Sequence, residues 1–261
     1  MLSKLLKKDL KKNVRWMWIL FVSTIGFAIL GRLVKELGDN IVFFKILGIF
    51  FDSVFYSLAV NLILQPFLRN FLNFSKSFYG DESYLTHTLP ATKNELITSK
   101  FLTAIIEISL GFLCLVISIL IMFLSPTMFD KLKLFVSIVI SGKFSIYLVI
   151  ALFVVLVVVE FLMFISVIYF SIVIAYRAKE KRVLKTFLLT SAMAFVAITI
   201  LSIAMIVVLA INGVKMTSAT LILSSSAFMS VLITGIVVYS AISVAFYFLA
   251  RKEFNKGVNV D

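Results

Sequence analysis

The chain has 261 residues, of which 62% are hydrophobic and 15% are charged, and its mean hydropathy is +1.12. A soluble globular chain is only about 45–50% apolar. This composition therefore excludes a soluble globular protein and predicts a membrane protein. A spanning helix uses about 20 apolar residues, so the length allows roughly six spans with their connections. That leaves no room for a fused ATPase or receptor domain. The lone Cys114 excludes an intrachain disulfide.

Apolar stretches between the charged residues predict an all-α fold, a bundle of six transmembrane helices that forms a single transmembrane domain over residues 1–261. The spans must be helices because lipid offers no partner for backbone polar groups. Since no small-residue cleavage site follows the first span, we expect it to be retained rather than removed as a signal peptide. The predicted spans are residues 14–34, 46–68, 101–124, 144–176, 186–211 and 218–250.

The net charge of +12 is best explained by topology. Most of the 25 Lys and Arg residues fall in the amino terminus, the second and fourth connections and the carboxyl-terminal tail. Positive charge concentrates on the cytoplasmic side of membrane proteins, so both termini are predicted to be cytoplasmic. A nucleic-acid surface is the alternative source of such an excess, but the chain lacks a soluble fold to carry one.

The amino terminus has an amphipathic pattern. Leu2, Leu5, Leu6 and Leu10 recur at helical spacing, and lysines fill the positions between them. This pattern predicts a separate amphipathic helix over residues 1–13 that lies in the cytoplasmic interface of the membrane. Such a helix either anchors the chain to lipid alone or also rests on a cytosolic partner.

Catalytic motifs are missing from the sequence. The Gly142-Lys143 pair has Ser137 where a phosphate loop needs its first glycine, and Phe144 where it needs Ser or Thr. The single histidine, His87, excludes a zinc helix with two histidines, and no Gly-x-Ser-x-Gly turn occurs. We therefore expect no enzyme site, metal site or cofactor in this chain. Energy would have to come from an ion gradient or a partner protein.

Residues 69–100 form the longest polar segment, which is predicted to be structured rather than a flexible linker because aromatic residues recur along it. Thr92 and Glu95 have the spacing of a capping box, so a helix is expected to begin at Lys93. Pro90 disfavours helix at Leu89. The segment should hold a short helix ending near residues 84–88, a sharp turn, and a second helix that continues into the third span. The alternative is an interfacial loop whose aromatic rings lie among lipid headgroups.

The same segment resembles a known family, the membrane permease subunits of type-2 ATP-binding-cassette (ABC) exporters, especially the small six-span bacterial ones. The resemblance is carried by Gly80-Asp81-Glu82-Ser83-Tyr84-Leu85-Thr86, by Thr88-Leu89-Pro90-Ala91-Thr92-Lys93, and by Glu95-Leu96 and Ser99-Lys100. It covers about 25 residues closely, and the span count and orientation extend it loosely over the chain.

The resemblance implies a permease that works as a homodimer or heterodimer in the bacterial plasma membrane, with a separate cytosolic ATPase subunit in two copies. ATP and magnesium would be bound by that partner. The cargo would be an apolar or amphipathic substrate, such as a peptide. The resemblance also implies that residues 78–88 dock on the ATPase and that the chain bends sharply at Pro90. The coupling residues would be Phe78, Asp81, Glu82, Tyr84, Leu85, Thr88 and Pro90.

Three carboxyl groups fall inside predicted spans. Glu160 is the deepest, while Glu107 and Asp52 lie about two helical turns from a span end. No Lys or Arg is expected near mid-membrane to pair with them. They either line a path for cargo or are satisfied within the bundle. Two alternative functions remain open: an ion-coupled carrier or channel that uses Glu160 and Glu107, and a peptide-binding immunity protein.

Overall fold

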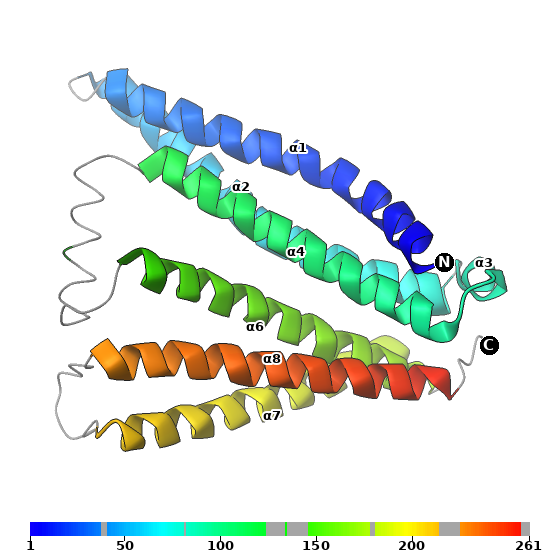
Figure 1. The fold of residues 1–261 in the computed structure, drawn as a ribbon. Coiled ribbons are helices and arrows are strands. Elements are labelled where there is room, and N and C mark those ends of the chain that lie inside the picture. The colour runs from blue at the N-terminus through cyan, green and yellow to red at the C-terminus, as the bar shows by residue number, and fades with distance from the viewer. Residues whose placement is uncertain are drawn as a thin grey trace. The chain divides into compact units, whose positions relative to one another are not determined.

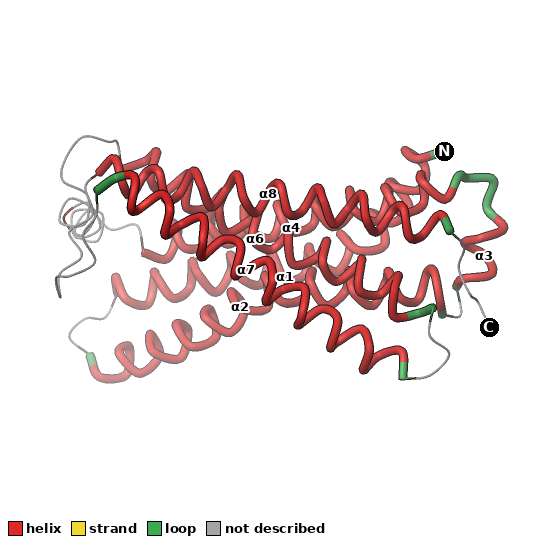
Figure 2. The backbone as a smooth tube through the Cα atoms, turned by 90° about the horizontal axis from the view of Figure 1, so that it is seen from below, coloured by secondary structure: helices red, strands yellow, loops and turns green. Residues whose placement is uncertain are grey.

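The computed structural model describes residues 1–37, 41–80, 82–123, 134, 146–177, 181–213 and 225–256. Every regular element in these ranges is helical, as Figure 2 shows, so the all-α class is confirmed. The helices are α1 (Leu2–Leu37), α2 (Val42–Tyr79), α3 (Ser83–Thr88), α4 (Lys93–Phe123), α6 (Ile146–Ala175), α7 (Arg182–Ile211) and α8 (Ser225–Asn255) (Figure 1).

Six of these helices are long and apolar enough to cross a membrane, and their most apolar stretches have mean hydropathies from 1.8 to 3.2. Each predicted span overlaps one of the six. The predicted ends at residue 124, residues 144–145 and residues 218–224 lie outside the described residues. The chain is therefore a multi-pass membrane protein. Among the helices that the structure describes, α3, with six residues, is too short to span.

The amino terminus differs from its prediction. Instead of a separate interfacial helix over residues 1–13, α1 runs without a break from Leu2 to Leu37 and is itself a candidate span. No glycine or proline occurs between Leu2 and Gly26, so nothing interrupts the backbone hydrogen bonds where the polarity changes. Asn13 and Met17, on either side of the expected break, are both buried. The amphipathic pattern marks the first turns of a long spanning helix.

The chain divides into two compact units. The first comprises Met1–Leu72 and Thr98–Phe129, and the second comprises Asn73–Ile97 and Asp130–Asp261. The division passes through α2 and α4. The end of α2 and the start of α4 therefore belong, with α3, to the unit that contains α6, α7 and α8.

In the first unit, small residues allow the helices to approach closely. Ala28 of α1, Phe55 of α2 and Met122 of α4 form one buried cluster. Gly111 of α4 lies so near α2 that an added Cβ would be 3.0 Å from the carbonyl oxygen of Leu62. Because a backbone atom cannot rotate away as a side chain can, glycine is required here by packing.

In the second unit, α6, α7 and α8 pack against one another (Figure 1). Buried Met163 and Val167 of α6 meet Ala197 of α7 and Tyr239 of α8. The glycine in α8, Gly235, sits against α6, where an added Cβ would be 2.7 Å from Leu156 Cδ1. Since α8 is unbroken from Ser225 to Asn255, its small residues serve close packing rather than a helix break.

We predict that Gly111→Val destabilises the first unit by about 1–3 kcal/mol, because the added methyl groups overpack the contact with Leu62. Gly26→Val is the matched control, since an added Cβ at Gly26 meets nothing within 4 Å. Thermal unfolding in detergent micelles measures both. A transition temperature lowered equally by the two variants would contradict the role of Gly111 in packing.

Candidate functional site

The short helix α3 carries two large exposed side chains. Tyr84 is 76% exposed and Leu85 is 68% exposed. Exposed apolar side chains on the spanning helices of a membrane protein face lipid, but α3 is not part of a span. Figure 2 shows it as a separate turn beyond the ends of α2 and α4. Apolar side chains displayed on such a segment are typical of a protein contact.

Local sequence determines where α3 lies between its neighbours. α2 ends before Gly80, where a Cβ would lie 3.0 Å from Lys76 Cα, so glycine lets the chain turn closely over the last turn of α2. α3 ends at Leu89, which has extended backbone angles, φ −64° and ψ 140°, because the following Pro90 excludes the helical region for it. Residues 80 and 90 thus bound the short helix on both sides.

The start of α4 has the two reciprocal hydrogen bonds of a capping box. The Thr92 backbone N–H donates to Glu95 Oε2 at 3.0 Å, and the Glu95 backbone N–H donates to Thr92 Oγ1 at 3.2 Å. Each bond satisfies a donor that the first turn of a helix leaves unpaired. As a result, α4 begins at Lys93, the residue that the sequence predicts.

Near the end of α2, before α3, lies a group of buried aromatic rings, which we call the aromatic layer: Phe74 and Phe78 of α2, Tyr169 of α6 and Phe254 of α8. Each of these side chains is at most 1% exposed. Phe74 stacks on Tyr169 with ring centroids 4.1 Å apart, and Phe78 meets Phe254 edge to face at 4.7 Å. The aromatic layer therefore joins the end of α2 to both α6 and α8.

Polar contacts surround the aromatic layer. Asn94 Oδ1, at the start of α4, accepts hydrogen bonds from Arg251 Nε and Asn255 Nδ2 of α8, both at 2.8 Å. On the α6 side, the Ser75 and Tyr176 hydroxyls lie 2.9 Å apart and share a hydrogen bond. These bonds join residues on both sides of α3 to the helices that the aromatic layer also contacts: Ser75 to the end of α6, and Asn94 to α8. Residues 73–97, which we call the elbow, are thus fastened at both ends within the second unit.

Not all residues predicted to couple to a partner are on the surface. Tyr84, Leu85, Glu82, Thr88 and Pro90 are exposed, and Glu82 Oε2 accepts a hydrogen bond from Ser77 Oγ at 3.4 Å. Asp81 lies outside the described residues.

Phe78 departs from its prediction. Its side chain is 0% exposed, because its ring packs against Phe254. A side chain buried in this way offers no surface to a docked partner, and it instead joins the end of α2 to α8.

The embedded carboxyl groups have separate environments. Asp52 forms an ion pair with Lys35, with Nζ 2.8 Å from Oδ1, so the expectation that no cation pairs with these carboxyls is wrong for Asp52. Glu160 is half-buried, and the Tyr239 hydroxyl donates to its Oε1 at 3.5 Å. Glu107 is only 1% exposed and accepts from Asn70 Nδ2 at 2.8 Å. Each of the three carboxyl groups thus has a polar partner of its own within its unit.

The residues that hold the elbow were not identified from the sequence. Tyr169, Tyr176, Arg251 and Phe254 lie in or beside α6 and α8, far along the chain from residues 73–97. The sequence does place basic and aromatic residues near the carboxyl-terminal ends of both helices. Such residues are common at the membrane interface of any spanning helix, so they do not point to a contact with residues 73–97.

Comparisons with protein-family models, with curated proteins and with solved structures found no match for this chain. Among the described residues, no group of three His, Cys, Asp or Glu side chains lies close enough to hold a metal ion.

We predict that Phe78→Ala destabilises the protein by about 3–5 kcal/mol, because it removes a fully buried ring and leaves a cavity. Tyr84→Ala, which removes an aromatic ring of similar size from the same segment, should change stability by less than about 0.5 kcal/mol because that ring is exposed. Thermal unfolding in micelles compares the two. Equal destabilisation would show that the aromatic layer is not the support of the elbow.

Proposed function

We propose that this chain is the membrane permease subunit of an ABC exporter of the type-2 class, and that α3 docks on a separate cytosolic ATPase. The observation that carries the proposal is the combination, within one elbow, of exposed Tyr84 and Leu85 on α3 with a buried aromatic layer that joins the start of the elbow to α6 and α8. An exposed apolar surface on a rigid support is suited to receive force from a partner.

The direction of that force follows from the contacts. Pressure on α3 would reach Phe78 and pass through its ring contact with Phe254 into α8, while the Phe74 ring contact with Tyr169 would carry it into α6. On the α4 side, Asn94 would transmit it to Arg251. Packed rings and short hydrogen bonds transmit displacement because interiors of this kind have low compressibility.

In this mechanism the ATPase subunits, present in two copies, bind ATP and magnesium and supply the energy. Their closure would move the elbow, with α6 and α8, and switch a dimer of permeases between inward-facing and outward-facing states. The permease has no catalytic role. Positive charge concentrated near α3 and at the two termini supports a cytoplasmic position for the elbow. A location in the bacterial plasma membrane is part of the same proposal.

For the cargo, the proposal is an apolar or amphipathic molecule such as a peptide. The half-buried Glu160, with Tyr239 on the facing helix α8, offers the polar contact that an amphipathic or cationic cargo requires inside an otherwise apolar bundle.

The test is assembly with a candidate ABC ATPase, sought among the genes that neighbour this one. Replacing Tyr84 and Leu85 together with Asp should abolish co-purification with the ATPase and reduce permease-dependent ATP turnover by at least about tenfold, because two charges would be buried without partners in the docking contact. The matched control, Tyr84→Phe with Leu85→Ile, keeps the apolar surface and should keep both activities. Unchanged assembly of the Asp variant would contradict the proposal.

A second candidate function, ion-coupled transport without an ATPase, is favoured by Glu107. One of its carboxyl oxygens, Oε1, is buried and accepts no hydrogen bond within the described residues. The other oxygen, Oε2, accepts from Asn70 Nδ2, and Asn13, Asp9 and Arg69 are near enough to interact with the carboxyl group. A buried carboxyl with an open oxygen is a candidate site for a proton or a small cation.

Transport by the purified chain in liposomes, without any ATPase, distinguishes the two functions. Ion coupling through Glu107 predicts gradient-driven uptake that Glu107→Gln abolishes. The exporter proposal predicts no gradient-driven transport by the isolated chain.

A further inference from the structure

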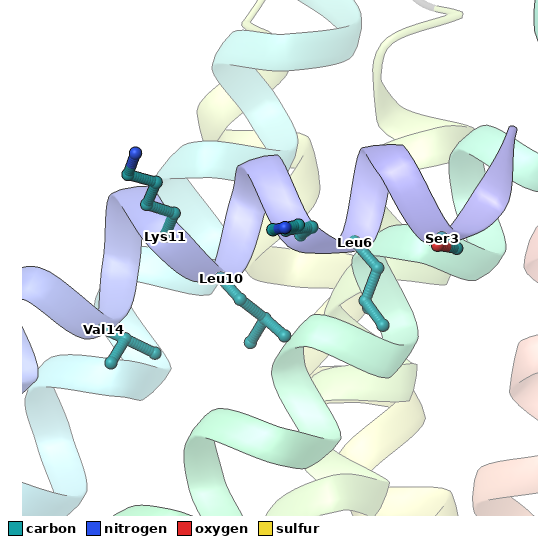
Figure 3. Close-up of a pocket in the computed structure, with 6 residues that line it drawn as sticks. Ser3, Leu6, Leu10, Lys11 and Val14 are labelled. Carbon is teal, nitrogen blue, oxygen red and sulfur yellow. The ribbon is translucent and has the colours of Figure 1, made fainter.

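Polar side chains on an open helix face need a protein partner only where water is excluded. At the first turns of α1, water is available. A shallow groove of about 410 Å³ there is lined by Ser3, Leu6, Lys7, Leu10, Lys11 and Val14 (Figure 3). Its polar residues precede the span predicted for α1, residues 14–34. The groove therefore requires no second protein.

A row of polar side chains on α2 lies much deeper in the membrane. Ser53, Ser57, Asn61 and Gln65, which we call the polar row, recur every four residues and so follow one face of the helix. Ser57 is the middle residue of the predicted span 46–68, and Asn61 lies about 6 Å from it along the helix. The hydrocarbon core extends about 15 Å to either side of its middle. The polar row is thus within the apolar part of the bilayer.

The polar row is open to the surroundings of the chain. Ser53, Ser57 and Asn61 are exposed, and Gln65 is half-buried. Large apolar side chains on the same open face, such as Val60 and Leu64, are about half exposed. Lipid suits those side chains but offers no hydrogen-bonding partner to the polar ones.

The amides distinguish this face from the other exposed faces. A hydroxyl can donate to the carbonyl oxygen four residues earlier, as Thr199 and Ser202 of α7 do at 2.8 and 2.9 Å. Asn61 makes the same kind of bond, from Nδ2 to Ser57 O at 2.9 Å. An amide, however, has a second N–H and a carbonyl oxygen, and the helix backbone has no N–H left to donate to that oxygen. Asn61 therefore presents a donor and an acceptor to a neighbouring helix.

The complement of an amide is another amide, which donates and accepts at once. Asn61 and Gln65 are the only Asn or Gln residues in the six predicted spans, so no other predicted span of this chain offers that complement. A second copy does, because it inserts in the same orientation and brings its own Asn61 to the same depth. About a twofold axis, each residue of the row would lie opposite its counterpart, and the small Ser53 and Ser57 permit close approach.

We infer that the polar row of α2 is the contact between two copies of this chain, with the two Asn61 amides paired near its centre. The inference needs no ATPase and does not depend on docking at α3. It deepens the proposed function in one respect, since it identifies the surface through which two permeases would meet.

Disulfide crosslinking in native membranes tests the contact. In a Cys114→Ala chain, Ser57→Cys should give a covalent dimer on oxidation with copper phenanthroline, because counterparts beside a twofold axis lie within reach of a disulfide. Thr199→Cys, the matched control, places a cysteine at an exposed position of α7 and should remain monomeric. No dimer through Ser57→Cys, or equal crosslinking at the two positions, would overturn the contact.

Förster transfer between donor-labelled and acceptor-labelled copies in liposomes measures the strength of the contact. With the labels on Lys252→Cys in the Cys114→Ala chain, Asn61→Leu should lower the association constant on the order of tenfold, because the paired amide bonds are lost. Asn61→Gln should retain association. Ser202→Leu, which removes an exposed polar group from α7, should leave association unchanged.

A chain that does not associate without these substitutions, or equal weakening by Asn61→Leu and Ser202→Leu, would overturn the inference. Because the liposomes contain no ATPase, these results concern the dimer contact alone. Docking at α3 is judged separately by co-purification, so the failure of one proposal is distinguishable from the failure of the other.

Discussion

The edge-to-face contact between Phe78 and Phe254 is the interaction on which the architecture of the elbow depends. It joins the last turn of α2 to the last turns of α8, and both rings are completely buried. Aromatic rings bury about 150–250 Å² each and add a specific geometry beyond their area. Without this contact, the polar bonds of Asn94 to α8 would be the main tie between the elbow and that helix.

The division of the chain into two units determines which helices move with the elbow. α2 and α4 run mostly in the first unit, yet residues 73–97 belong to the second. A displacement applied to α3 would therefore enter α6 and α8 first. The exposed Tyr84 and Leu85 thus lie in the segment of the chain that is joined to those two helices.

Much of this fold could be predicted from the sequence because its determinants are local. Hydropathy located the six spans, and Thr92, Glu95 and Pro90 located the boundaries of α3 and α4, since caps and prolines act on their own neighbours.

Phe78 could not be assigned to the interior, because a run of alternating aromatic and polar residues does not reveal which face meets partners more than 90 residues away. The Lys35–Asp52 pair was missed for a similar reason: α1 and α2 had to be placed side by side first. The continuity of α1 was missed because amphipathicity indicates a polar face, not a helix end.

The central claim is that the elbow moves as one body with α8 when the ATPase works. Spin labels at Thr88 of α3 and Lys252 of α8, both exposed positions, test it directly in the assembled complex. The buried Cys114, the single cysteine of the chain, is first replaced with alanine. The account predicts that ATP binding leaves the distance from residue 88 to residue 252 within one protomer unchanged, while it changes the distance between the two residues 88 of the permease pair. A change in the distance from residue 88 to residue 252 upon ATP binding would contradict the account.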